Sequence, residues 1–187
     1  MPRALPIAAL LPALVGLTAC KDGVLTRIDV DGSATTTVSG GNILTELVGS
    51  LGFSSFTAMD ITSAEELQNQ GVEPGDIKDV RLISFELEAI DPSNADLAFI
   101  ESMSVDVEAP GLDQIQIASA SDFPPGVGLV EFDIDDVDLT EYVVSESMTL
   151  TTDVSGNQPP EDTTVEARYL LEVGVTLQGA NNARKND

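Results

Sequence analysis

Apolar and polar residues alternate along residues 165–177, near the end of the chain. The apolar positions are Val165, Ala167, Tyr169, Leu171, Val173, Val175 and Leu177, and between them lie Glu166, Arg168, Glu172 and Thr176. A period of two residues places these two sets on opposite faces of an extended strand. The apolar face of such a strand needs a second layer to cover it, which restricts the chain to a layered β structure.

Shorter runs upstream show the same period. One face is expected to carry Ile83, Phe85, Leu87 and Ala89; Met103, Val105 and Val107; Ile115 and Ile117; Phe132 and Ile134; and Val144, Met148 and Leu150. Turn-forming residues separate these runs at 91–94, 109–111, 123–126 and 156–160. The pattern predicts a mainly β fold, an antiparallel two-sheet β-sandwich. Residues 24–38 predict a first strand or pair of strands, with Asp31-Gly32-Ser33 as a turn or bulge.

Two stretches near the N-terminus depart from this period. Residues 42–51 place apolar side chains at helical spacing after Asn42, and Ser63 with Glu66 forms a capping box for a second short helix. We therefore expect one or two short helices near the N-terminus, which cap the open end of the sandwich. The alternative is a partner-binding edge that exposes Phe53 and Phe56. Residues 138–142 predict a further helical turn.

The amino end has the anatomy of an export signal. Arg3 precedes an uncharged apolar stretch, residues 4–17, which is shorter than the ~20 residues that a membrane-spanning helix needs. Small residues follow, as at a signal cleavage point. The stretch ends in Leu17-Thr18-Ala19-Cys20, and Cys20 is the only cysteine of the 187 residues.

This segment resembles a bacterial lipoprotein precursor, because Leu17-Thr18-Ala19-Cys20 matches the lipobox. The resemblance covers residues 1 to about 21. It implies a diacylglyceryl group on the thiol of Cys20, cleavage between Ala19 and Cys20, and in many bacteria acylation of the new amine. Lys21, in place of the aspartate associated with inner-membrane retention, favours the outer membrane of a Gram-negative cell envelope. The alternative is a plain secretory signal with an incidental cysteine.

The expected organisation has four parts. Residues 1–19 form a lipoprotein signal peptide, 20–23 a lipid anchor and short tether, 24–179 a single β-sandwich domain, and 180–187 a disordered tail. The three residues between Cys20 and Val24 span only about 10 Å when extended. A tether of this length suits a module that acts at the membrane surface.

The chain is strongly acidic, with 32 Asp and Glu against eight Lys and Arg, a formal net charge of −24. This charge repels nucleic acid, so the expected partners are the membrane, through the lipid on Cys20, and an envelope protein. Several basic residues lie near the two ends of the mature chain: Lys21, Arg27, Arg184 and Lys185. If those ends meet in space, a small basic patch would lie beside the anchor.

The chain has no histidine, and its one cysteine is assigned to lipid. Catalytic Ser-His-Asp and Cys-His arrangements are therefore excluded, and so is the usual zinc site. The leading interpretation is a non-catalytic binding or structural module without a cofactor. A carboxylate-based hydrolase is an alternative, although the chain has no Trp and only two Tyr to stack against a sugar.

A second alternative is a calcium-dependent adhesion or ligand-binding module. Four carboxylates, from Asp133, Asp135, Asp136 and Asp138, lie within six residues, and calcium binds several oxygen ligands at close range. The segment does not fit the EF-hand pattern, since Val137 occupies the third ligand position counted from Asp133. The four carboxylates are therefore either solvated or bound to a cation.

Overall fold

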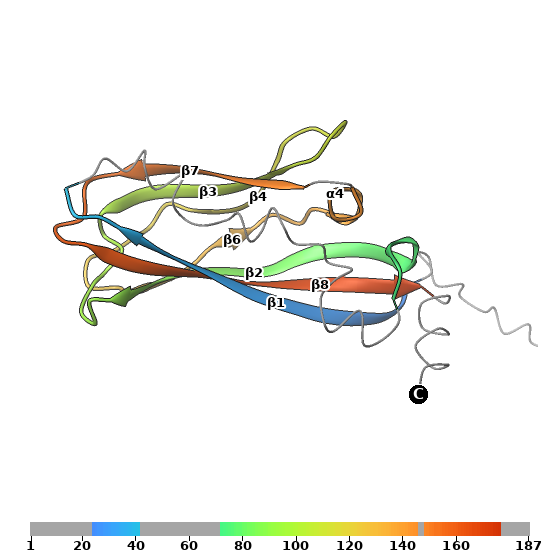
Figure 1. Ribbon diagram of the computed structural model, residues 1–187, viewed down its shortest axis with the longest axis horizontal. Helices are drawn as coiled ribbons and strands as arrows, with labels where there is room; N and C mark the ends of the chain where they lie inside the picture. The colour runs from blue at the N-terminus through green and yellow to red at the C-terminus, as the bar shows by residue number, and fades with distance from the viewer. Residues whose placement is uncertain (1–23, 42–71, 146–147, 177–187) are drawn as a thin grey trace, which may run out of the picture.

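The computed structural model describes residues 24–41, 72–145 and 148–176. In these residues eight strands form two antiparallel four-stranded sheets, which face each other as a β-sandwich (Figure 1). The predicted fold class is confirmed. The signal peptide, the tether, the tail and both helices expected between residues 42 and 70 lie outside the described residues.

The first sheet has the order β1-β8-β2-β5 and the second the order β6-β4-β3-β7. The strands of the first sheet are β1 (Val24–Val38), β8 (Thr163–Thr176), β2 (Ile77–Asp91) and β5 (Leu129–Glu131). Those of the second are β6 (Asp133–Ile134), β4 (Ile115–Ala120), β3 (Ile100–Glu108) and β7 (Thr149–Gly156). A 3-10 turn, η3 (Pro74–Asp76), precedes β2, and a one-turn helix, α4 (Thr140–Val143), precedes β7.

The core lies between the two sheets. Phe85, Leu87, Met103 and Val105 are among its largest fully buried side chains. Phe132, which lies between β5 and β6, packs edge-on against Phe85 with ring centroids 4.9 Å apart. In β8 every predicted core residue that the structure describes is buried, and Leu177 lies beyond them. The alternation of β8 is therefore confirmed from Val165 to Val175.

β1 runs without a turn through Asp31-Gly32-Ser33, which corrects the expected turn or bulge. Its register against β8 is continuous from Thr26 to Val38. Gly32 lies opposite Tyr169, and a Cβ atom at this glycine would be 2.2 Å from the Tyr169 hydroxyl oxygen. The glycine is needed because the tyrosine ring packs against the strand backbone, not because the chain reverses.

β2 is interrupted by three irregularities, and one of them corrects a predicted core position. Leu82 pairs with Leu171 and Ser84 pairs with Leu170, so Ile83 is an extra residue in β2. A bulge of this kind shifts the side-chain alternation by one residue. Ile83 is consequently 46% exposed, and Leu82 takes the core position before Phe85.

The segment before β7 contains a second correction. Val144 was expected on a strand face with Met148 and Leu150, but it follows α4 and is 43% exposed. Only Leu150 of the three is fully buried. The predicted helical turn itself is confirmed, and its Tyr142 donates a hydrogen bond of 2.6 Å to the backbone oxygen of Asp113.

Candidate functional site

The two ends of the described chain lie side by side. Val24, the first residue of β1, pairs with Thr176, the last residue of β8, and Ile77 of β2 pairs with Val175. One end of the first sheet therefore holds both the first and the last described residue of the chain. Cys20 and Ala19 lie outside the described residues, as do Lys21, Arg184 and Lys185. We call this the entry end of the sandwich.

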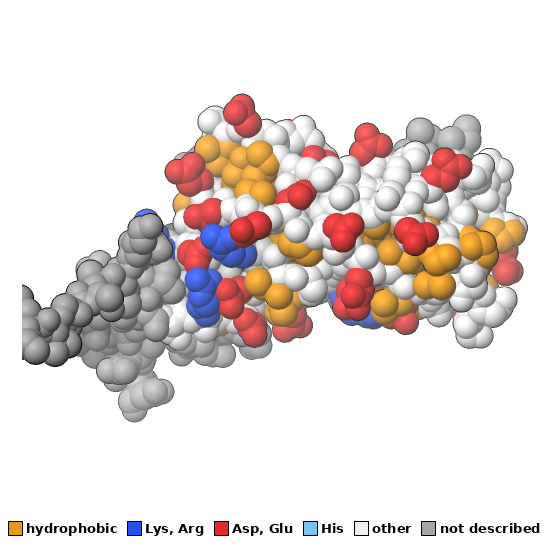
Figure 2. All heavy atoms as spheres, turned by 180° about the vertical axis from the view of Figure 1, so that it is seen from behind, with side chains coloured by type: hydrophobic (Ala, Val, Ile, Leu, Met, Phe, Trp, Pro, Cys, Tyr) orange, Lys and Arg blue, Asp and Glu red, His pale blue; other side chains and the backbone are white. Residues whose placement is uncertain are grey.

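A network of ion pairs covers the entry end. Arg27 of β1 binds Asp79 of β2 and, at 2.6 Å, Glu172 of β8. Arg81 donates from Nε to the other carboxylate oxygen of Asp79 at 2.8 Å, and it also binds Asp136. Figure 2 shows Lys and Arg side chains gathered with Asp and Glu side chains toward one end of the molecule. Because the charges alternate in sign, this end is not a purely basic surface.

Asp79 is the centre of this network because of its backbone. It lies at a register shift between Lys78 and Val80, with φ of 52°, a left-handed conformation that aspartate tolerates better than most residues. Hydrogen bonds, first from Arg81 and then from Arg27, hold the pKa of Asp79 below its ordinary value, against the opposing effect of burial. Sequence reasoning missed this residue, since nothing local marks a bulge at an aspartate.

The four candidate calcium ligands do not share one site. Asp133 is exposed in β6, and Asp135 accepts a hydrogen bond of 3.0 Å from Gln116. Asp136 binds Arg81. Asp138 accepts from the Thr140 backbone nitrogen at 2.9 Å and from its hydroxyl at 2.5 Å, an arrangement that fixes the start of α4. In residues 24–41, 72–145 and 148–176, no group of three Asp, Glu, Cys or His could hold a metal ion.

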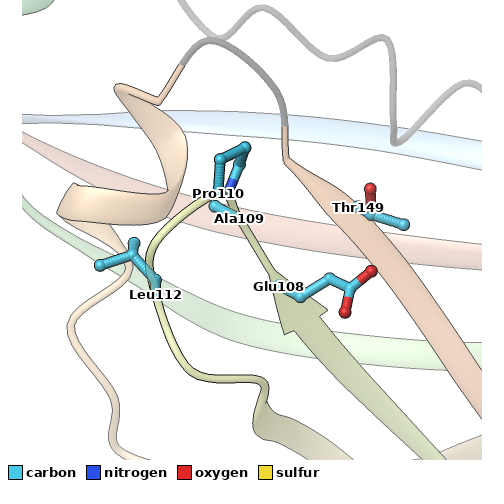
Figure 3. A pocket seen from close by; sticks show the side chains of 5 residues that line it. All are labelled: Glu108, Ala109, Pro110, Leu112 and Thr149. Carbon is cyan, nitrogen blue, oxygen red and sulfur yellow. The ribbon is translucent and has the colours of Figure 1, made fainter.

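A shallow hollow of about 290 Å³ opens where β3 ends and β7 begins, near α4 (Figure 3). It is lined by Glu108, Ala109, Pro110, Leu112 and Thr149. Glu108 and Thr149 are cross-strand partners of β3 and β7. Only one carboxylate lines this hollow, whereas a glycosidase places two across its cleft.

A second hollow, about 150 Å³, lies at the opposite end of the sandwich. Its lining includes Asp96, Glu161 and Thr163. The carboxylate of Asp96 accepts backbone N–H bonds from Gly126 at 2.7 Å and from Ala98 at 3.2 Å. Both of its oxygens therefore hold loops together, a structural role that the sequence did not reveal.

None of the described helices is both long enough and apolar enough to cross a membrane. No protein-family model matches the sequence, and no curated protein is significantly similar to it. A solved structure from desmodium yellow mottle tymovirus is similar at 9% identity with a TM-score of 0.25, over 95% of this chain and 93% of that one. A likeness of that extent carries no functional argument.

Proposed function

We propose that this chain is a lipid-anchored bacterial envelope protein. In this proposal acyl chains on Cys20 hold a non-catalytic binding or structural β-sandwich close to the membrane surface. The observation that carries it is the lipobox cysteine, which only three residues separate from the first residue of β1. One acyl chain binds a membrane marginally, and two or three bind it firmly.

The pairing of Val24 with Thr176 supports a defined orientation. Because the tether leads directly into a paired strand, the entry end of the sandwich is the part next to the lipid. Three extended residues separate that end from the anchor by about 10 Å. The proposed module therefore acts near the membrane from which it extends.

The intact mass of the protein isolated from its native membrane tests the anchor. The expected species begins at Cys20 and carries a lipid-sized increment, and a Cys20→Ser variant loses both the increment and membrane association. Thr18→Ser, which keeps a small residue in the lipobox, serves as the matched control and stays lipidated. An unmodified wild-type chain that is released from cells in free form would overturn the proposal.

The proposed outer-membrane location has its own test. In lipoproteins of this kind the residue after the cysteine influences sorting, so Lys21→Asp is expected to move the protein to the inner membrane of a Gram-negative host. Separation of the two membranes by density, followed by immunodetection, measures the distribution. Equal distributions for the wild type and Lys21→Asp would show that this residue does not direct sorting here.

The predicted basic patch beside the anchor is a further part of the proposal. The meeting of β1 and β8 at the entry end supports it, since both terminal segments leave the sheet there. Neutralising Lys21, Arg184 and Lys185 together is expected to weaken binding of the lipidated protein to vesicles that contain anionic lipid, most clearly at low salt. Unchanged binding would contradict a role for these residues.

A further inference from the structure

Three of the five exposed large hydrophobic residues in the described chain gather at one place. They are Ile90 (43% exposed), Val127 (37%) and Leu129 (38%). Leu129 lies opposite Glu88 in the β2–β5 pairing, and the next step places Gly128 beside Ala89, to which it is hydrogen-bonded at 2.7 Å. Ile90 follows Ala89 and Val127 precedes Gly128, so the two residues flank this bonded pair. We call these three residues the β5 patch.

The β5 patch borders an open strand edge. β5 pairs with β2 on one side only and ends the order of its sheet. Val130 faces Leu87 in the pairing, and the backbone nitrogen of Phe132 bonds to Phe85, so the intervening backbone groups of Leu129 and Glu131 point away from β2. In the described part of the chain these outward groups have no backbone partner. They offer hydrogen bonds to an additional strand.

The carboxylates beside the patch carry uncompensated charge. Glu131 lies two residues from Leu129 on the same face of the strand, and Asp91 follows Ile90. Both are exposed, and neither has an ion-pair partner in residues 24–41, 72–145 and 148–176. The neighbouring cation, Arg168, is already bound by three other carboxylates. A complementary surface must therefore be apolar and positively charged.

We propose that the outer edge of β5 binds an extended segment of a partner protein by strand addition, and that this segment carries apolar side chains next to Lys or Arg. An antiparallel segment would place an apolar residue opposite Leu129 and a basic residue opposite Glu131. The backbone of Val127 is already bonded to Leu97 and Pro124, so Val127 would add only apolar side-chain contact beyond the end of the pairing. Backbone hydrogen bonds would supply affinity, while the side-chain pairs would supply selectivity.

The position of the β5 patch along β2 indicates from which end of the sandwich the partner would approach. β2 begins at the entry end with Ile77, and Ile90 lies near its other end, about 40 Å away at ~3.3 Å per residue. Figure 2 shows hydrophobic side chains among Asp and Glu side chains at the end on the right, opposite the gathered Lys and Arg. If the chain is anchored as proposed, the partner is met on the side away from the membrane. The binding edge itself does not depend on that anchor.

The test uses the full-length protein and a dye-labelled peptide, acetyl-Lys-Thr-Val-Thr-Val-Thr-Lys-amide, with binding measured by fluorescence anisotropy. A double Val127→Ser and Leu129→Ser variant is expected to weaken binding about tenfold or more. Glu131→Gln is expected to weaken it less and to reduce its salt dependence. The matched control is Ile83→Ser, because Ile83 is equally exposed on β2 but lies nearer the entry end; binding should change less than about twofold.

Two altered peptides examine the mode of binding. Replacing both lysines by glutamate, or methylating alternate backbone nitrogens, should abolish binding, because the first reverses the charge and the second removes the edge hydrogen bonds. The proposal is overturned if the wild-type protein does not bind the lysine peptide or if the double variant binds it as well as the wild type. It is also overturned if the double variant instead abolishes self-association of the protein, which would assign the edge to a second copy.

Discussion

β8 and β2 are hydrogen-bonded neighbours of similar length, yet they differ in regularity. β8 alternates between buried and half-buried residues from Thr163 to Val173, and Gly174 and Val175 are then both buried. β2 contains three register shifts against that same partner. The extra residues are Asp79, Ile83 and Ile90. Asp79 and Ile83 lie outside the core, although simple alternation would place them on the same face as buried Phe85 and Leu87.

The difference shows that both strands contribute to the core, whereas the bulges of β2 also change which of its side chains reach the surface. Asp79 joins two arginines at the entry end, whereas Ile90 contributes to the β5 patch at the other end. A bulge changes the direction of a side chain without interrupting the sheet. β2 therefore combines a buried face with two distinct surface features.

Removing one residue from each strand should give the largest contrast. Deleting Leu170 from β8 shifts the rest of the strand by one position and turns its core residues toward solvent, so we expect no cooperative unfolding transition. Deleting Ile83 from β2 leaves Leu82 and Phe85 in regular alternation, so the protein should still fold. Thermal unfolding followed by circular dichroism measures both, and equal loss of folding would contradict the bulge.

Truncating two residues of β2 that are two positions apart should sharpen the comparison further. Phe85→Ala removes a buried ring that packs on Phe132 and should cost about 3–5 kcal/mol of unfolding free energy. Ile83→Ala should cost less than about 0.5 kcal/mol, because that side chain is exposed. Urea titration determines both values. Similar costs at the two positions would mean that Ile83 belongs to the core after all.

The outer face of β8 can be tested through Arg168, which binds Glu88 at 2.5 Å, Glu166 at 2.9 Å and Glu86 at 3.3 Å. Arg168→Gln leaves three carboxylates close together and should lower the unfolding free energy by about 1 kcal/mol at low salt. The loss should shrink at 1 M salt, where the repulsion is screened. A loss that is independent of salt would indicate packing rather than charge.

The bulge in β2 at Asp79 should produce a small effect, and one that depends on pH. The pKa of this carboxyl is lowered in the folded state, so its stabilising contribution is present above the unfolded pKa of about 3.9 and disappears as pH falls through the folded value. Asp79→Asn, which also tolerates a positive φ, should cost about 0.5 kcal/mol at neutral pH. Stability curves of wild type and variant between pH 2 and 7 should converge at the acid end; parallel curves would contradict this assignment.

The sequence predicts the fold class and the buried face of β8, because the alternation of apolar and polar residues within one strand shows which side faces the core. The turns at Pro92, Pro110 and Pro124 are equally local, and the structure confirms them with backbone bonds of 2.8 Å, 3.0 Å and 3.2 Å. Bulges depend on the partner strand, so Ile83 was misplaced and Asp79 was not recognised. The β5 patch was not predicted for the same reason, since the pairing of β2 with β5 is what brings residues 88–90 and 127–129 to one place.

The order of the first sheet has a consequence for biosynthesis. β1 is made early and β8 is made last, yet β8 lies between β1 and β2 and is the one described strand that pairs with β1. Contacts between residues so distant in sequence cannot form until the whole intervening chain has been synthesised. The emerging polypeptide therefore cannot join β1 to β2 in the first sheet until β8, the last of the described strands, has been synthesised.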